Sequence, residues 1–146
     1  MTKYSDLKKR IKLNEGFKSS VYFDQLGFAT IGYGHLIRKK EKHFLKKEYS
    51  KKYLLKIFES DFELALSQFE KHYGHLGLKK KTKDMVIEMI FQLGIKGQKK
   101  FKLMNLHLKK NEIHMACLEM RNSLWYTQTP KRVNKLITSL LNTNER

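Results

Sequence analysis

The sequence of 146 residues has one cysteine, one proline and no long apolar run. Because Cys117 stands alone, no disulfide can form within the chain, and its Ala-Cys-Leu setting is typical of a small buried side chain rather than a nucleophile. A membrane-spanning helix needs about 18 apolar residues, and no segment approaches that length. The first residues, MTKYSDLKKRIKLNEGF, also lack the apolar core of a secretory signal. We therefore expect a protein that is made in the cytoplasm without a signal peptide.

Acidic residues are also scarce, with 14 Asp and Glu against 31 Lys and Arg and a formal net charge of +17. A field of this sign attracts polyanions such as nucleic acid, anionic lipid or an acidic cell wall, and the charge alone does not choose among them. A solvated basic surface without a partner is an equally good interpretation. The lysine runs at 38–47 and 79–83 would suit nucleic acid, but no recognisable motif for reading nucleic acid accompanies them. We expect no specific nucleic-acid partner.

The first third of the chain predicts a helix followed by a β-hairpin. Apolar residues four positions apart indicate a helix over residues 5–15, which Ser5 can cap and Gly16 can end. Two β-rich runs, 20–24 and 28–33, are joined by a short turn and read as a hairpin. Two glycines at the end of the second run predict a tight backbone there.

The rest of the chain is predicted to be helical. Segment 38–48 is strongly basic and matches no pattern, but apolar spacing indicates a long helix from Ser50 to about Tyr73. Four further helices are expected: one after Thr82 that ends at Gly94, one at about 98–108, one at about 111–122 with Asn111 as its cap, and one that Pro130 opens behind Thr129.

This order of elements predicts an α+β protein with a small β part near the N-terminus. We expect one domain over residues 1–146, with a β part at about 16–49, a connecting helix at about 50–73, and a helical part at about 74–146 that also includes the N-terminal helix.

The most informative stretch runs from Glu15 to His35, EGFKSSVYFDQLGFATIGYGH. Glu15 should lie at the C-terminal end of the first helix, where the helix dipole disfavours a negative charge and so raises the pKa of a carboxyl. Asp24, at the hairpin bend, should be wetter and stay ionised, and Thr30 on the returning strand can point its hydroxyl to the same place. A protonated and an ionised carboxyl together suit the acid and base roles of glycoside hydrolysis. Without further context the pattern is weak, because most acidic residues are simply exposed.

The same stretch resembles the catalytic signature of the phage-type lysozyme (muramidase) family. Two further blocks, MVIEMIFQLG at 85–94 and LWYTQTPKRVNKLIT at 124–138, are similar to segments of that family in the same order. The resemblance covers residues 7–37 and 50–141. It implies a lysozyme-like fold, with a small N-terminal β-hairpin lobe and a larger C-terminal helical lobe joined by a long helix.

Carried over position by position, the resemblance implies that Glu15 is the catalytic acid, Asp24 the second carboxylate and Thr30 the residue that helps to hold the attacking water. It implies that Arg132 pairs with the catalytic glutamate, which would lower the pKa of Glu15 and oppose the effect of the helix end. It also implies an inverting glycosidase that cleaves the β-1,4 bond between N-acetylmuramic acid and N-acetylglucosamine.

The resemblance also assigns secondary roles. Leu36 and Phe91 match positions that contact the substrate, while Gln92 is either a hydrogen-bond partner of the sugar or a core amide. His35 and Asp61 match a structural pair of the family. No cluster of residues has the spacing of zinc ligands, so we expect neither a metal nor a cofactor.

The family implies a monomeric endolysin that acts on bacterial peptidoglycan, reaching the wall once the inner membrane is permeabilised at the end of a phage cycle. Two other classes stay open: a catalytically silent domain that binds wall glycan, and a basic nucleic-acid-binding protein. An electrostatic contact with an anionic wall or membrane, including disturbance of membranes by the basic final helix, would be an addition to the enzyme.

Overall fold

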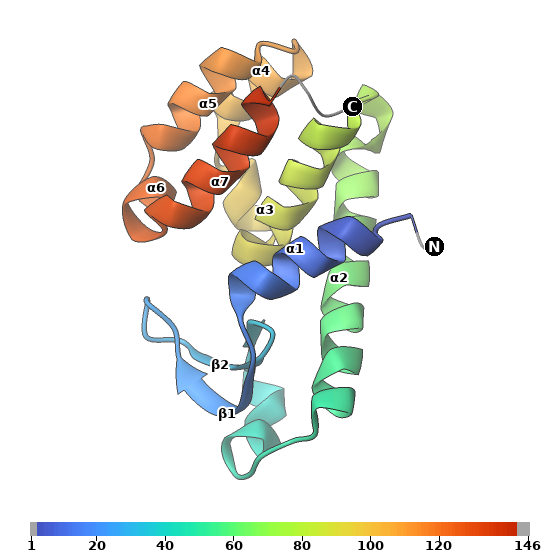
Figure 1. Cartoon of the computed structure of the whole chain (residues 1–146), viewed down its shortest axis with the longest axis vertical. Coiled ribbons are helices and arrows are strands. Elements are labelled where there is room, and N and C mark those ends of the chain that lie inside the picture. The colour runs from blue at the N-terminus through green and yellow to red at the C-terminus, as the bar shows by residue number, and fades with distance from the viewer. Residues whose placement is uncertain (1–2, 143–146) are drawn as a thin grey trace. The chain divides into compact units, whose positions relative to one another are not determined.

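A computed structural model describes residues 3–142 of the chain. It divides into two compact units, of which the first ends at Leu64 and the second begins at Ala65. The boundary falls inside the long helix α2 (Lys51–Tyr73), which the sequence placed correctly. A small antiparallel sheet belongs to the first unit, and the second unit is helical. The elements can be followed along the chain in Figure 1 by their colour, from blue at the N-terminus to red at the C-terminus. The prediction of an α+β protein is therefore confirmed.

Helix α1 (Ser5–Glu15) has the predicted bounds and buries one face through Leu7 and Ile11. Gly16 follows it with a φ of 72°, and its amide donates to the carbonyl of Lys12 over 3.0 Å, so the helix ends where expected. The prediction that Ser5 caps the helix is wrong. Ser5 is already its first helical residue, the preceding residue is Tyr4, and no side chain caps this end.

The sheet has three antiparallel strands in the order β1 (Lys18–Phe23), β2 (Ala29–Gly32) and β3 (His35–Leu36). The first two form the predicted hairpin, shifted by one or two residues. The third strand was not predicted, because two residues are too few to show an alternating pattern. It pairs back on β2 through a turn whose glycines, Gly32 and Gly34, have φ values of 67° and 77°. The tight backbone expected there is confirmed.

The basic segment that matched no sequence pattern forms a 3₁₀ helix, η1 (Lys39–Leu45). Its anchor is Phe44, which is buried in one cluster with Ile31 of β2 and Leu54 of α2. This cluster joins sheet, 3₁₀ helix and long helix inside the first unit. A single aromatic residue among lysines carries no periodicity, so the sequence could not show the anchor.

The second unit is built of helices around α3. After η2 (Gly74–Leu76) its helices are α3 (Lys80–Lys99), α4 (Lys102–Lys109), α5 (Ile113–Arg121), α6 (Leu124–Gln128) and α7 (Pro130–Leu141). Helix α3 supplies a continuous run of buried residues from Asp84 to Ile90, and α7 packs against α3 and α5 (Figure 1). The predicted stop at Gly94 appears as a break in the helical backbone, with φ of 76°, after which the helix resumes.

Two details of the second unit correct the sequence predictions, and one agrees with them. Asn111 does not cap α5: Glu112 precedes the helix, and Asn111 has a φ of 60° in the preceding turn. Helix α6 was missed, although Ser123 caps it by accepting a hydrogen bond from the amide of Tyr126 over 3.1 Å. Pro130 does open the last helix. Among residues 3–142, no helix has both the length and the apolar character that crossing a bilayer requires.

Candidate active site

Glu15 is the last residue of α1, and its carboxylate lies against the backbone of Gly34 in the turn between β2 and β3. A Cβ atom added to Gly34 would stand 2.5 Å from Oε1 of Glu15 and 2.8 Å from its Cδ. Glycine is therefore required at position 34 for two reasons: its φ of 77° and the space taken by the carboxylate. The turn between β2 and β3 therefore contacts the Glu15 carboxylate on one side.

Asp24 occupies the hairpin bend between β1 and β2. Its Oδ1 accepts hydrogen bonds from the backbone amides of Leu26 and Phe28, each over 2.9 Å. An Asp that bonds to amides two and four residues further on is a common way to fix a turn. Here the same bonds hold the carboxylate in one orientation and leave it partly exposed to solvent.

Thr30 lies on β2 directly opposite Tyr22 of β1. The Thr30 side chain is buried, and its hydroxyl donates to the carbonyl of Phe28 over 2.9 Å. Burial raises the pKa of Tyr22, and the negative charges of Glu15 and Asp24 raise it further. The charges of both carboxylates thus act on the Tyr22 phenol, and Thr30 is the cross-strand partner of Tyr22. Glu15, Asp24 and Thr30 all belong to the first unit.

Tyr22 was not singled out from the sequence. The available signal was its spacing: residues two apart on a strand share a face, so Tyr22 belongs to the face of the hairpin that leads to Asp24. Leu36, the predicted substrate contact of this unit, pairs with Thr30 from the other side, on β3, and is half exposed. Its neighbour in sequence, His35, is buried instead.

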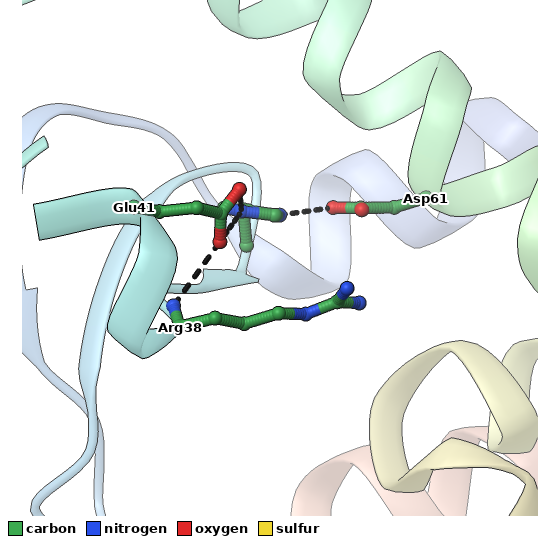
Figure 2. Close-up of polar contacts among 4 residues, drawn as sticks. Arg38, Glu41 and Asp61 are labelled. Atoms are coloured by element: carbon green, nitrogen blue, oxygen red, sulfur yellow. Dashed lines mark hydrogen bonds and ion pairs between the residues drawn. The ribbon is translucent and has the colours of Figure 1, made fainter. Parts of the chain in front are cut away.

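His35 lies between the carboxylates of Asp61 and Glu41, both of which are labelled in Figure 2. Its Nδ1 is 2.8 Å from Oδ2 of Asp61 on α2, which is the pair that the resemblance implied, and its Nε2 is 3.1 Å from both oxygens of Glu41 on η1. Glu41 also accepts the backbone amide of Arg38 over 3.1 Å. Glu41 was missed, because nothing in a lysine-rich segment indicates which acid turns inward.

This arrangement controls the charge of the histidine. Burial alone lowers the pKa of His35, but the hydrogen bond and charge of Asp61, together with those of Glu41, outweigh it and hold the pKa above its usual 6.5. The His35 cluster, meaning His35, Asp61 and Glu41, therefore fastens β3, α2 and η1 to one another. It keeps in place the strand that follows the turn at Glu15.

The remaining predicted residues belong to the second unit. Gln92 is tied within it: its Oε1 accepts from the indole nitrogen of Trp125 over 3.0 Å, and its Nε2 lies 3.5 Å from Oγ1 of Thr129. These bonds favour the interpretation of Gln92 as a core amide. Phe91, the preceding residue on α3, is partly exposed.

Arg132 lies on α7, and its Nη2 donates to Oε2 of Glu88 on α3 over 3.3 Å. Glu88 is fully buried. A buried carboxylate needs a partner of opposite charge, and an arginine with several donors suits this role. Sequence reasoning missed Glu88, although an acid in the middle of the apolar run MVIEMIF is an available signal. The buried ion pair with Glu88 therefore holds the guanidinium of Arg132 in place within the second unit.

Carboxyl and hydroxyl side chains such as those of Glu15, Asp24 and Thr30 can transfer protons to and from a substrate. Over residues 3–142, no group of three or more histidine, cysteine and acidic side chains is arranged to hold a metal. The first unit thus offers acid–base chemistry at the end of α1 and the start of the hairpin.

Comparison of the sequence with known proteins identifies the family to which the chain belongs. Residues 12–142 match the model of the family described as phage lysozyme. The chain is 33% identical to "Probable T4-type lysozyme 2" of Dictyostelium discoideum over an alignment covering 92% of each protein. It is 28% identical to the "Pre-baseplate central spike protein Gp5" of Enterobacteria phage T4, over 92% of this chain but 27% of that longer protein. Since the family match runs through most of the chain and its α+β fold agrees, this protein belongs to the phage lysozyme family and is a glycoside hydrolase of the muramidase type.

Proposed function

We propose that this protein hydrolyses the β-1,4 bond between N-acetylmuramic acid and N-acetylglucosamine in bacterial peptidoglycan, with Glu15 as the proton donor. The observation that carries the proposal is the position of Glu15 at the end of α1, against the turn between β2 and β3, with Asp24 in the hairpin bend and Thr30 on β2. These are the three positions at which the chain matches the family's catalytic signature.

The proposed reaction is a single displacement. The carboxyl of Glu15 gives its proton to the glycosidic oxygen as the bond to the anomeric carbon breaks. A water attacks that carbon from the opposite face and loses its proton to Asp24. The Oγ1 of Thr30 already donates to the Phe28 carbonyl, so its lone pairs can accept a hydrogen bond from this water. The product would have the inverted configuration, and the protein would need no cofactor.

The other predicted residues take part by holding the substrate or the acid. Leu36, half exposed beside Thr30, would contact the sugar. The resemblance to the family implies the same role for Phe91 and Gln92, and it implies that Arg132 supports the catalytic acid. His35 and Asp61 would support the site by holding β3.

The biological role that we propose is that of a monomeric endolysin. The protein would reach the wall after the inner membrane is permeabilised and would release phage progeny by host lysis. Expression in a bacterium tests this role: cells should stay intact until chloroform permeabilises the membrane and should then clear. Clearing without chloroform would argue against this role and leave the hydrolase proposal unaffected, whereas no clearing after chloroform would count against both.

The enzymatic proposal is tested by clearing of purified peptidoglycan. We expect Glu15→Gln, which keeps the shape but removes the acid, to lower the rate by roughly a hundredfold or more, the usual contribution of a positioned general acid. The matched control is Glu63→Gln, the same change at an exposed position on α2, which should clear at the wild-type rate. Equal clearing by Glu15→Gln and wild type would contradict the proposal.

A second measurement tests the stereochemistry and separates the alternatives. Proton NMR of the first product should show the α-anomer if the β-bond is cleaved with inversion. A β-anomer would indicate a covalent intermediate and a different role for Asp24. Binding to wall without any release of reducing ends would favour a silent glycan-binding domain.

A further inference from the structure

The solvent-facing sides of α4 and α5 carry large apolar side chains. Leu103 and Leu106 on α4 are 58% and 44% exposed, and Met115 and Leu118 on α5 are 46% and 58% exposed. In each helix the two residues are three positions apart and therefore share a face. We call these four residues the α4–α5 surface. Helices α4 and α5 pack against each other and form one helical hairpin (Figure 1).

These exposed residues are not needed for the core of the second unit. The opposite sides of the two helices supply the buried residues: Met104 and Leu108 from α4, and Ala116, Cys117 and Met120 from α5. Each of the two helices therefore carries exposed apolar side chains in addition to those on its buried face. Single exposed leucines are ordinary, but four on adjoining helices mark an interaction surface.

Cations are frequent on the α4–α5 hairpin and on the chain that leads into it. Between residues 96 and 121 the chain has seven Lys and Arg side chains against two acidic ones. All seven are exposed: Lys96, Lys99, Lys100, Lys102, Lys109, Lys110 and Arg121. One of the two acids, Glu112, lies 2.9 Å from Nδ1 of His107, so its charge faces a ring that is itself basic. The hairpin itself thus carries four exposed cations, Lys102, Lys109, Lys110 and Arg121, in addition to its exposed apolar side chains.

We propose that the α4–α5 surface binds the surface of an anionic phospholipid bilayer. Lysines at the level of the headgroups would attract anionic lipid, and the leucines and Met115 would enter the boundary with the acyl chains. The apolar residues decide between partners. A hydrophilic polyanion such as nucleic acid or a wall polymer would satisfy the lysines but leave Leu103 and Leu118 in water. A second copy of the chain would bring two sets of cations face to face, which is unfavourable.

The final helix is less suited to this role than the hairpin. Leu141 at the end of α7 is 39% exposed, but Val133, Leu136 and Ile137 are buried within the second unit. They could meet a membrane only if the unit opened. The α4–α5 surface needs no such change, because its apolar side chains already face solvent.

Vesicle co-sedimentation tests the proposal with the whole protein. We expect wild type to sediment with vesicles of phosphatidylglycerol and phosphatidylcholine, and to bind vesicles of phosphatidylcholine alone at least about tenfold more weakly, because each lysine near an anionic surface contributes several-fold. The double variant Leu103→Ser/Leu118→Ser should lose about tenfold in binding to the anionic vesicles. The matched control is Leu13→Ser, an equally drastic change at a residue of α1 that is 77% exposed, and it should bind like wild type.

The same samples must show that the fold is intact. Neither variant changes the proposed catalytic residues, so both should clear permeabilised wall at the wild-type rate and melt within a few degrees of wild type. Unchanged sedimentation of the double variant, or equal loss in Leu13→Ser, would overturn the proposal. Equal binding of wild type to neutral and anionic vesicles would also overturn it, as would a concentration-dependent dimer that the double variant abolishes.

Discussion

The ion pairs of His35 allow a prediction in which both size and pH dependence follow from the structure. Replacing His35 by Asn removes the cation but keeps a polar side chain of similar size. It leaves Asp61 and Glu41 without the charge that lies 2.8 Å and 3.1 Å from them. Asp61 belongs to α2, Glu41 to η1 and His35 to β3, so the change weakens the contacts that hold these three elements together.

The magnitude comes from the two charged contacts. A hydrogen bond to a charged group contributes about 1.5–3 kcal/mol. The ring is 8% exposed but the carboxylates are 25% and 24% exposed, so water partly replaces the lost partner and the lower end of the range applies. Two contacts at the lower end give about 3 kcal/mol in the free energy of unfolding. For a chain of this length that is a loss of roughly 6–12 °C in melting temperature.

The pH dependence has a fixed sign. The pKa of His35 is raised in the folded protein, so the charged ring stabilises the fold fully below the unfolded pKa of about 6.5, and this stabilisation is lost as the pH rises through the folded pKa. The difference between wild type and His35→Asn should therefore be largest near about pH 5.5, where carboxylates are still ionised, and smaller at about pH 9.

Urea unfolding of both proteins at these two pH values measures the difference. Asp61→Asn and Glu41→Gln, alone and combined with His35→Asn, divide it between the two contacts in double-mutant cycles. A destabilisation that is equal at both pH values, or larger at the alkaline one, would refute the reasoning, as would a coupling of zero for Glu41.

The remaining predictions concern the acid and the buried ion pair. Gly34→Ala should lower the clearing rate at least tenfold, because its Cβ would displace the carboxylate of Glu15, whereas Gly16→Ala, also at positive φ but with open space at its Cβ, should cost about 1–3 kcal/mol of stability and leave the rate nearly unchanged. Equal activity of the two variants, each measured below its melting temperature, would contradict the placement of Glu15. Glu88→Gln should destabilise by about 1.5–3 kcal/mol, since it removes the negative charge that the Arg132 guanidinium contacts on a fully buried side chain, and a loss below about 1 kcal/mol in urea unfolding would refute that role.

The sequence predicted those parts of the fold whose signals are local. The bounds of α1, the hairpin and the start of α7 depend on apolar spacing, Gly16 and Pro130, all of which lie within the element that they define. The wrong caps have the same origin. Ser5 and Asn111 are residues that often cap helices, but the choice between neighbouring residues depends on where the chain enters the helix.

The parts that the sequence could not predict depend on distant residues. Helix η1 exists because Phe44 reaches the core and Glu41 reaches His35, and both partners lie outside the segment. The catalytic candidates were found for a different reason. Glu15 and Asp24 are ordinary acids by themselves, and only the family signature singled them out. Glu88 lies inside a matched block as well, yet its role became visible only with its burial against Arg132.

The contacts of the acidic residues show how the few negative charges of the chain are used. At least seven of the 14 acids form ion pairs within residues 3–142, and two more occupy the proposed catalytic positions. Each of these pairs takes up one acidic and one basic side chain, so the excess of positive charge stays with the other lysines and arginines. A surface of this kind contacts anionic material over a wide area, but only where apolar side chains are also exposed can it distinguish a bilayer from a polymer. In the second unit that combination occurs on α4 and α5, so added salt should release the protein from wall more completely than from anionic membranes.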